Sequence, residues 1–279
     1  MRQSDHSVAY LEGKAKEIRK TVLTMIHEAK SGHPGGSLSA SDIMAALYFD
    51  ELNVDPANPK WEDRDRFILS KGHACPVQYS CLALRGFFPY ENIYTLRKEG
   101  SILQGHPDMK RCPGIDISTG SLGQGIACGV GMAIAAKRDG KNYRVFVVIG
   151  DGESDEGEVW EALNSAAKYK LDNFVVILDN NNLQNDNRCE VVMPLGDLRA
   201  KLEAFGCNVY EINGHDMKEI TDALDKIREN QNTTGKPSAI LAHTVKGKGV
   251  SFMENVVMWH GVAPDDEQYA RAMKEVEEA

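Results

Sequence analysis

The segment from Tyr143 to Leu183 constrains the fold of this chain more than any other. It begins with an apolar, β-branched run at 145–149, which is typical of a buried strand. Apolar positions between 159 and 167 then repeat with the period of one helix face, and a second apolar run follows at 174–178. A strand, a helix and a strand form a βαβ unit, so we expect the two strands to be parallel and close together.

Polar residues follow both of these strands at the point where each one ends. Asp151 lies between Gly150 and Gly152, and Asn181 follows the second run. Ligands of open parallel sheets bind beyond the carboxyl ends of the strands. One carboxylate and one amide oxygen are too few to enclose Mg²⁺, which would take its remaining ligands from phosphate oxygens. The segment therefore predicts a diphosphate ligand bound through a metal, although a plain turn and loop with solvated carboxylates would give the same short motifs.

Charge and composition exclude several classes of function. The net charge of −9 argues against a surface that binds nucleic acid or an anionic membrane. The six cysteines lack the spacing of a zinc site, so we expect free thiols in a reducing compartment. The chain has no signal-peptide pattern and no apolar run of 18 residues, which predicts a soluble, cytoplasmic protein.

The remaining pattern alternates helices with short apolar strands and shows no composition break. We expect an α/β fold with a three-layer, doubly wound parallel sheet, in a single domain over residues 1–279. Helices are predicted at 8–30, 76–86, 90–98 and from about 125 to 137, and a capping box at 39–42 predicts another that ends near 52. The segment 31–36 is predicted to be a loop.

Five glycines between 120 and 131 accompany the helix that starts near Gln124. Each glycine inside a helix costs roughly 1 kcal/mol relative to alanine. So many together indicate a backbone that approaches something closely. Two alternatives are a ligand at the helix N-terminus and a second helix packed against Gly125, Gly129 and Ala133.

Four histidines lie beside glycine or in small-residue loops, namely His33, His73, His106 and His260. A single such histidine is more often structural. Four of them near a diphosphate site favour a substrate that has many hydroxyls and a carbonyl, because imidazole exchanges protons near neutral pH. Sugars fit this description. Zinc is a poor alternative, because neither HxxxH spacing nor a cysteine pair is present.

Taken together and in order, these motifs resemble the transketolase family. The similar segments are SGHPGG (31–36), SKGHACP (70–76), GHP (105–107), TGSLGQG (119–125), GDGESDEG (150–157), DNNNLQ (179–184), KGKG (246–249) and WHGVAP (259–264). The resemblance implies the thiamine diphosphate-binding fold, thiamine diphosphate with Mg²⁺ or Ca²⁺ as cofactors, and transfer of a two-carbon ketol unit from a ketose or ketose phosphate to an aldose.

The resemblance also assigns residues to roles. The metal would be bound by Asp151, Asn181 and the carbonyl of Leu183. The catalytic, substrate-facing residues would be His33, His73, His106 and His260. The cofactor-binding set would be His73, Gly120, Leu122, Gly150, Asp151, Gly152, Glu153, Asn181 and His260. Glu156 would belong to a carboxylate network between subunits.

Transketolases normally continue into a pyrimidine-binding domain and a third, C-terminal domain, and this chain stops near the end of the first. We therefore expect the N-terminal subunit of a split transketolase, in a heterotetramer of two copies of each chain, with the other domains supplied by the partner. The alternatives are a subunit of another thiamine diphosphate enzyme, similar to the α subunit of a 2-oxoacid dehydrogenase or to deoxyxylulose-phosphate synthase, or a non-catalytic relative. A Mg²⁺ phosphohydrolase is a further alternative, without the context of a phosphoenzyme loop.

Overall fold

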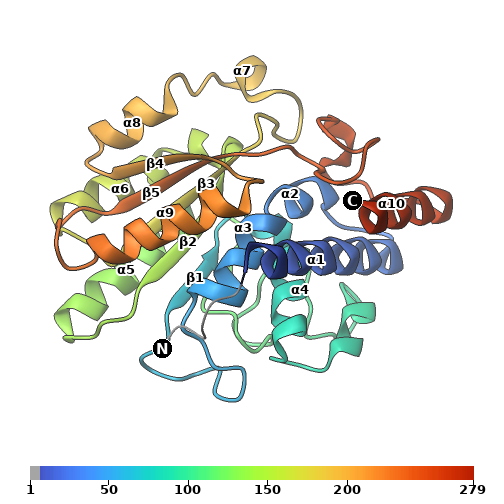
Figure 1. Cartoon of the computed structure of the whole chain (residues 1–279), viewed down its shortest axis with the longest axis horizontal. Helices are drawn as coiled ribbons and strands as arrows, with labels where there is room; N and C mark the ends of the chain where they lie inside the picture. Colours follow the sequence, from blue (N-terminus) through green and yellow to red (C-terminus); the bar gives the residue numbers. More distant parts are fainter. Residues whose placement is uncertain (1–6) are drawn as a thin grey trace.

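A five-stranded parallel sheet forms the centre of the structure, a computed structural model that describes residues 7–279 (Figure 1). The strand order is β1-β2-β3-β5-β4. Val145 pairs with Phe174, so the two strands of the predicted βαβ unit are parallel neighbours, as expected. The strands are β1 (Arg66–Leu69), β2 (Val145–Gly150), β3 (Phe174–Asn180), β4 (Asn208–Asn213) and β5 (Ser238–His243).

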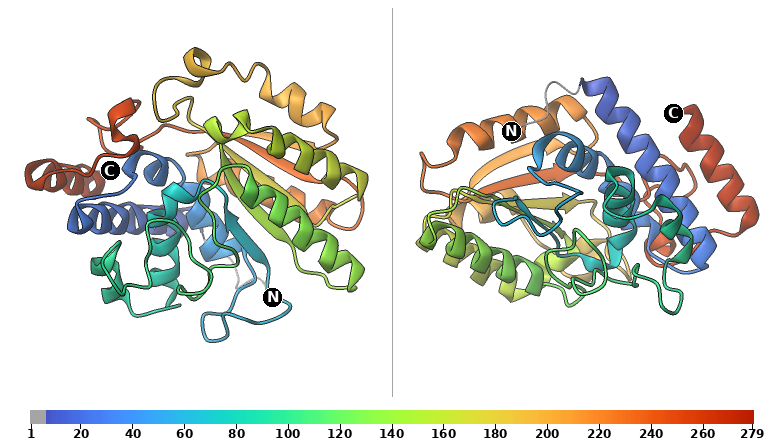
Figure 2. Two further views of the ribbon diagram at one scale, coloured as in Figure 1. Left: turned by 180° about the vertical axis from the view of Figure 1, so that it is seen from behind. Right: turned by 90° about the horizontal axis from the view of Figure 1, so that it is seen from below.

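Helices connect the strands and cover both faces of the sheet (Figure 2). The α-helices are α1 (Val8–Ala29), α2 (Pro34–Ser39), α3 (Ser41–Ala46), α4 (Cys75–Arg85), α5 (Gln124–Arg138), α6 (Gly157–Lys168), α7 (Cys189–Val192), α8 (Leu198–Ala204), α9 (Met217–Asn230) and α10 (Asp266–Glu278). Short 3₁₀ turns precede α4 and α6, at Gly72–Ala74 and Gly152–Asp155.

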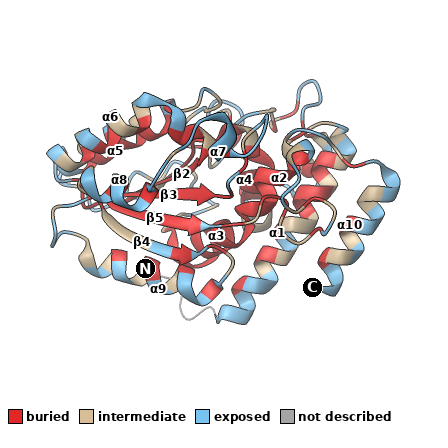
Figure 3. Ribbon diagram, turned by 90° about the horizontal axis from the view of Figure 1, so that it is seen from above, coloured by how far each residue is buried: buried red, intermediate tan, exposed pale blue. Residues whose placement is uncertain are grey.

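Side chains of the central strands alternate between two apolar cores. Along β2, Val147 and Ile149 pack with α5, α6 and α8, whereas Phe146 and Val148 pack with α1, α3, α4 and α9. This period of two is the pleat of a strand that is covered on both faces. Strands β2 and β3 are buried along their whole length (Figure 3). The predicted three-layer, doubly wound parallel sheet is confirmed.

Three local predictions near the N-terminal third are wrong. The segment after His33 is the short helix α2, in which Pro34 occupies the first turn, where its missing N–H costs nothing. The capping box at 39–42 does not form, because Ser39 Oγ donates to Asp179 on β3 instead. Helix α3 continues as a π-helical turn, Leu47–Glu51, so this helix ends near residue 52 as predicted. The helix predicted at 90–98 is instead a 3₁₀ segment, Tyr90–Thr95.

Two glycines of α5, Gly125 and Gly129, face the sheet. A Cβ on Gly129 would lie 2.6 Å from Val147 Cγ2, and a Cβ on Gly125 would lie 2.5 Å from Ser70 Oγ. The close approach predicted from the sequence is therefore real, but its partners are β2 and the end of β1. The prediction of a second helix against these glycines is wrong.

Two further observations concern the cysteines and the helices. All six cysteines are free thiols, as expected, and Cys128 alone among them is not fully buried. None of the helices within residues 7–279 has the length and apolar character needed to cross a membrane.

Candidate active site

A partly open cavity of about 140 Å³ lies beyond the carboxyl ends of β2 and β3. The register of these strands pairs Gly150 with Asp179, so the residues that follow both strands reach the same edge. Nine residues predicted from the sequence line the cavity: His73, Leu122, Gly150, Asp151, Gly152, Glu153, Asn181, Leu183 and His260. The βαβ unit thus delivers its polar residues to one place, as expected of a parallel sheet.

The Asp151 carboxylate is one of two buried acids that line this cavity. One oxygen accepts the backbone N–H of Gly152 at 2.8 Å, and the other accepts the N–H of Asn182. Burial, followed by the negative charge of Asp179, raises the pKa of Asp151 to about 6. A carboxylate destabilised in this way gains from a nearby cation, so its surroundings suit a divalent metal.

The Asn181 side chain and the Leu183 carbonyl provide two more hard oxygens. Asn181 Nδ2 donates to Asp179 Oδ2 at 3.3 Å, and its Oδ1 accepts the N–H of Leu183 at 3.1 Å. The carbonyl of Leu183 accepts a hydrogen bond from Lys246 Nζ at 2.9 Å. A carboxylate, an amide and a peptide carbonyl are ligands that Mg²⁺ and Ca²⁺ prefer.

Two buried lysines bring positive charge to the cavity, and neither has a role predicted from the sequence. Lys71 Nζ donates to Asp179 and, at 2.9 Å, to the carbonyl of Gly36. Lys246 Nζ also donates to His260 Nδ1 at 2.8 Å, and burial lowers the pKa of Lys246 to about 8. These lysines lie within SKGHACP and KGKG, so the motifs are the available signal. Their burial in one cavity is a property of the tertiary structure.

Three of the four predicted histidines contact one another; His73 and His260 line the cavity, and His33 lies against both of them without lining it. The ring of His33 lies 5.3 Å from that of His73 and 5.4 Å from that of His260, centroid to centroid, and the last two are 5.0 Å apart. Burial lowers the pKa of His33 to about 4 and of His260 to about 3, and it lowers the pKa of His73 well below its usual value. All three imidazoles are therefore neutral at pH 7.

His106 lies beyond this cluster and does not line the cavity. It packs on Gly120, where a Cβ would lie 3.0 Å from His106 Cδ2, and it is close enough to His33 to lower the pKa of that imidazole. Gly120 has a φ of 144°, a conformation that other residues rarely adopt. Gly120 therefore supports His106 and is not among the residues that line the cavity.

Glu153 lines the cavity, but protein donors already surround its carboxylate. It accepts the hydroxyl of Ser70, the N–H of Gly123 at 2.9 Å and the N–H of Gly150 at 3.2 Å. Glu153 thus ties the glycine-rich loop before α5 to the end of β2. Gly36, Gln184 and Asn185, to which the sequence analysis assigns no role, complete the lining.

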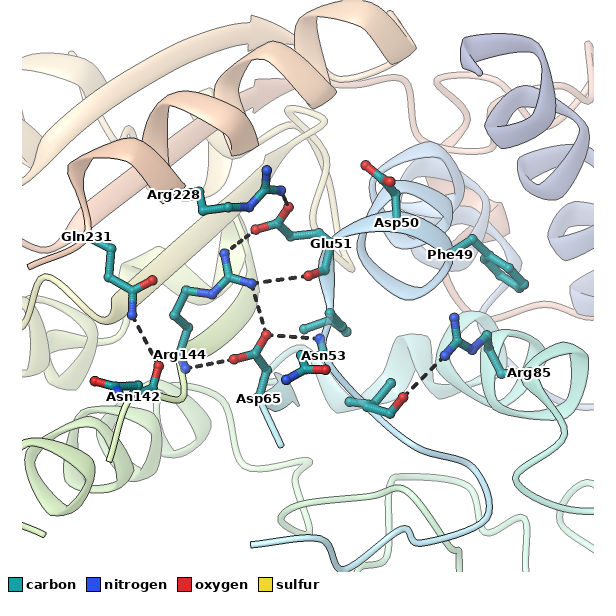
Figure 4. A pocket seen from close by; sticks show the side chains of 12 residues that line it. Phe49, Asp50, Glu51, Asn53, Asp65, Arg85, Asn142, Arg144, Arg228 and Gln231 are labelled. Carbon is teal, nitrogen blue, oxygen red and sulfur yellow. Dashed lines mark hydrogen bonds and ion pairs between the residues drawn. The ribbon is translucent and has the colours of Figure 1, made fainter. Parts of the chain in front are cut away.

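A larger cavity of about 320 Å³ lies at the opposite edge of the sheet (Figure 4). Its charged groups pair with one another: Arg144 bridges Glu51 and Asp65, and Arg228 also pairs with Glu51. Because these charges already pair with one another, they are less available to bind a charged ligand. We therefore place the candidate active site at the carboxyl edge.

The fold and this cavity define an α/β protein that binds its ligand at the carboxyl edge of a parallel sheet. The family described as "Transketolase, thiamine diphosphate binding domain" matches residues 12–276. This chain belongs to that family. The prediction that it is a subunit of a transketolase-type enzyme is confirmed.

Two bacterial relatives match almost their whole length. One is a subunit of the apulose-4-phosphate transketolase of Phocaeicola vulgatus, 44% identical over 271 residues that cover 97% of this chain and 95% of the relative. The other is the 6-deoxy-6-sulfo-D-fructose transketolase subunit SqwG of Clostridium sp. strain MSTE9, 44% identical over 267 residues that cover 96% of each.

The crystal structure of transketolase from Campylobacter jejuni superposes with a TM-score of 0.91 at 33% identity. The match covers 98% of this chain and 43% of the Campylobacter chain. This chain therefore corresponds to less than half of the solved transketolase. Membership of this family favours a transketolase over the alternative thiamine diphosphate enzymes considered in the sequence analysis.

Proposed function

We propose that this chain is the diphosphate-binding subunit of a split transketolase that moves a two-carbon ketol unit from a ketose to an aldose. One observation carries the proposal. Three hard oxygens, from Asp151, Asn181 and Leu183, share one cavity with two lysines and with His73 and His260, and His33 contacts both of these histidines. The oxygens suit a metal, the lysines suit a diphosphate, and the imidazoles suit a sugar.

The proposed metal is Mg²⁺ or Ca²⁺ held by Asp151, Asn181 and the carbonyl of Leu183. Within residues 7–279, no group of three or more His, Cys, Asp or Glu could hold an ion by itself. One carboxylate and two neutral oxygens suit an ion that takes its remaining ligands from the diphosphate. The Leu183 carbonyl has two lone pairs, so it can bind the metal and keep its hydrogen bond to Lys246, or exchange one for the other.

The histidines are proposed to bind the sugar and to move its protons. When bound, thiamine diphosphate supplies the nucleophilic carbon that takes up the two-carbon unit. His33 Nδ1 is buried and has no hydrogen-bond partner within residues 7–279, so it can bond to a substrate hydroxyl or carbonyl. His260 Nδ1 accepts from Lys246, which leaves Nε2 as the protonated nitrogen and a donor. His73 and His106 are the other two histidines that are proposed to bind the sugar.

A second chain is proposed to complete the active site. The two bacterial relatives are described as transketolase subunits, which implies a separate partner. We propose that the partner carries the pyrimidine-binding and C-terminal domains, that two copies of each chain form a heterotetramer, and that residues 1–279 form one domain. The free thiols fit the reducing compartment expected from the sequence, and a cytoplasmic location stays a prediction.

The substrates are proposed to be sugars or sugar phosphates. One relative is described as acting on apulose 4-phosphate and the other on 6-deoxy-6-sulfo-D-fructose, sugars that carry a phosphate or a sulfonate. An anionic group at one end of the sugar is the shared chemistry. Assays of ketol transfer with phosphorylated and neutral ketoses, alongside pyruvate decarboxylation, would identify the reaction.

The direct test is native mass spectrometry of the tagged chain isolated from its own source with Mg²⁺ present. A second chain together with bound thiamine diphosphate is the expected result. A homodimer that holds cofactor and transfers ketol units without a partner would contradict the split enzyme.

Asp151→Ala tests the metal assignment. We expect the affinity of the complex for thiamine diphosphate and Mg²⁺ to fall about 100-fold or more, because the buried carboxylate ligand is lost. Isothermal titration measures this directly, without activity. The control is Asp222→Ala, which removes an exposed carboxylate on α9 that pairs with Lys218. Near-normal cofactor affinity in Asp151→Ala would show that the metal assignment is wrong.

A further inference from the structure

Arg97 occupies an unusual position between the loops that carry two of the predicted histidines. Its φ is 62°, in the left-handed region that favours glycine, and its N–H donates to the carbonyl of Leu103 at 2.9 Å. A residue other than glycine held there costs about 1–3 kcal/mol, which the surrounding structure has to offset. Strained positions of this kind cluster at active sites and ligand-binding loops.

The guanidinium of Arg97 bridges the two loops. Nη1 donates to Ser31 Oγ at 2.8 Å, two residues before His33, and Nη2 approaches the carbonyl of Gly105 at 3.5 Å, one residue before His106. A Cβ on Gly105 would lie 3.2 Å from Arg97 Nε and 3.3 Å from its Cζ. The guanidinium therefore lies flat against Gly105, and both histidine loops contact one rigid planar group.

Arg97 is exposed, and its guanidinium donates to a hydroxyl and a carbonyl. Among the ion pairs of residues 7–279, none joins Arg97 to a carboxylate. After burial, Arg97 is the largest charge that lowers the pKa of both His33 and His106. The other charged or titratable groups that face His33 are His73, His106, Lys246 and His260. None of these is an acid that would cancel the effect of Arg97.

We propose that Arg97 is the positioning residue for the substrate-facing histidines, holding the loops of His33 and His106 at a fixed separation through one guanidinium. This inference rests on the proposed function, in which both histidines contact the sugar. The bridge fixes where the two imidazoles lie, and the positive charge disfavours their protonation. Arg97 itself need not touch the substrate.

Two substitutions separate the bridge from the charge. Arg97→Gly removes both, and glycine accepts the local φ without strain, so the fold should persist with a thermal midpoint within about 3 °C of the wild type. Arg97→Lys keeps the charge, but an ammonium cannot reproduce the planar contact with both loops. Lys98→Ala is the matched control, since it removes a neighbouring exposed positive charge.

The first readout is independent of catalysis. Ring protons of His33 and His106 are followed by NMR in the full chain as a function of pH, with resonances assigned by His→Gln variants. We expect both imidazoles to titrate at higher pH in Arg97→Gly, and at the wild-type pH in Arg97→Lys and Lys98→Ala. Unchanged titrations in Arg97→Gly would overturn the electrostatic part of the proposal.

The second readout is kcat/KM of the complex with its partner. We expect a loss of about tenfold or more in both Arg97→Gly and Arg97→Lys, because misplaced groups lose rate steeply, with the acidic limb of the pH profile shifted upward only in Arg97→Gly. Full activity in Arg97→Lys would overturn the positioning role. A wild-type complex without ketol transfer would refute the proposed function and leave the NMR test valid.

Discussion

At the scale of single residues, the cluster of His33, His73 and His260 shows how burial prepares side chains for chemistry. The three rings contact one another, and the charged neighbours that lower their pKa values most are lysines and an arginine. Neutral imidazoles keep one donor and one acceptor each, which is what a polyhydroxylated substrate requires. Because burial opposes protonation of these imidazoles, the same arrangement lowers the stability of the folded protein at low pH.

The cluster predicts that the stability of the protein falls in acid. The folded-state pKa values of His33 and His260, about 4 and about 3, lie below the value near 6.5 of the unfolded chain. The unfolded state therefore binds more protons as the pH falls below 6.5, so the stabilising contribution is complete above 6.5 and decreases as the pH falls toward 4.

Urea unfolding at pH 7.5, 6.0 and 5.0 measures this loss of unfolding free energy. In His33→Gln one titrating group is absent, so we expect a shallower decrease between pH 6.5 and 5 than in the wild type. Parallel curves for the two proteins would contradict a folded-state pKa near 4 for His33.

At the scale of elements, α5 illustrates what a glycine-rich helix gains from the sheet beneath it. Gly129 allows the helix to approach Val147 of β2 more closely than any side chain would permit. Gly131, in the same helix, has nothing within 4 Å of the position of its Cβ. A comparison of these two glycines therefore separates the effect of close packing from the effect of helix propensity.

Gly129→Ala and Gly131→Ala should therefore have opposite effects. We expect Gly129→Ala to lower the unfolding free energy by about 1–3 kcal/mol, because the new methyl group overlaps Val147 in a packed core. Gly131→Ala should raise it by up to roughly 1 kcal/mol through helix propensity. Chemical denaturation of both variants measures the two values. Equal effects of the same sign would show that α5 does not depend on close contact with β2.

The elements also differ in how readily the sequence predicts them. Strands β2 and β3 are predictable because five or more consecutive apolar residues reflect a strand buried on both faces. Helix α2 is not, because Pro34, Gly35 and Gly36 are typical of a turn. Gly35 is required there by its neighbours, since a Cβ would lie 2.9 Å from the carbonyl of Trp259, more than 200 residues away.

At the scale of the whole molecule, ion pairs at the amino edge of the sheet connect distant parts of the chain (Figure 4). Arg144 precedes β2 and pairs with Glu51, which ends the π-helical turn after α3, and with Asp65, which precedes β1. Arg228 of α9 pairs with the same Glu51. The network therefore joins α3 and α9, which cover the same face of the sheet, to the start of β1 and β2 at the end opposite the candidate active site.

Arg144→Met should destabilise the protein by about 3–5 kcal/mol, because Asp65 and Glu51 are buried and would lose a partner. Removing a guanidinium from the exposed pair of Arg199 and Glu203 by Arg199→Ala is the control, with an expected cost of about 0–1 kcal/mol. Thermal and urea unfolding measure both. A similar small cost for the two substitutions would mean that the network adds little to stability.

The parallel α/β sheet, its ligand-binding edge and most residues that line the cavity were predictable from the amino-acid sequence. Apolar runs, their period and the residues that end them are local patterns, and the carboxyl ends of parallel strands must meet at one edge. The ordered motifs then led to the transketolase family.

The pairing of polar groups inside that edge depends instead on how the layers pack. Lys71 reaches Asp179, which lies 108 residues away in the chain, and Arg97 bridges loops that no local pattern connects. Contacts of this kind depend on the distance between side chains in the folded molecule. Burial then sets the pKa of each group, and burial is a property of the tertiary structure and not of a sequence window.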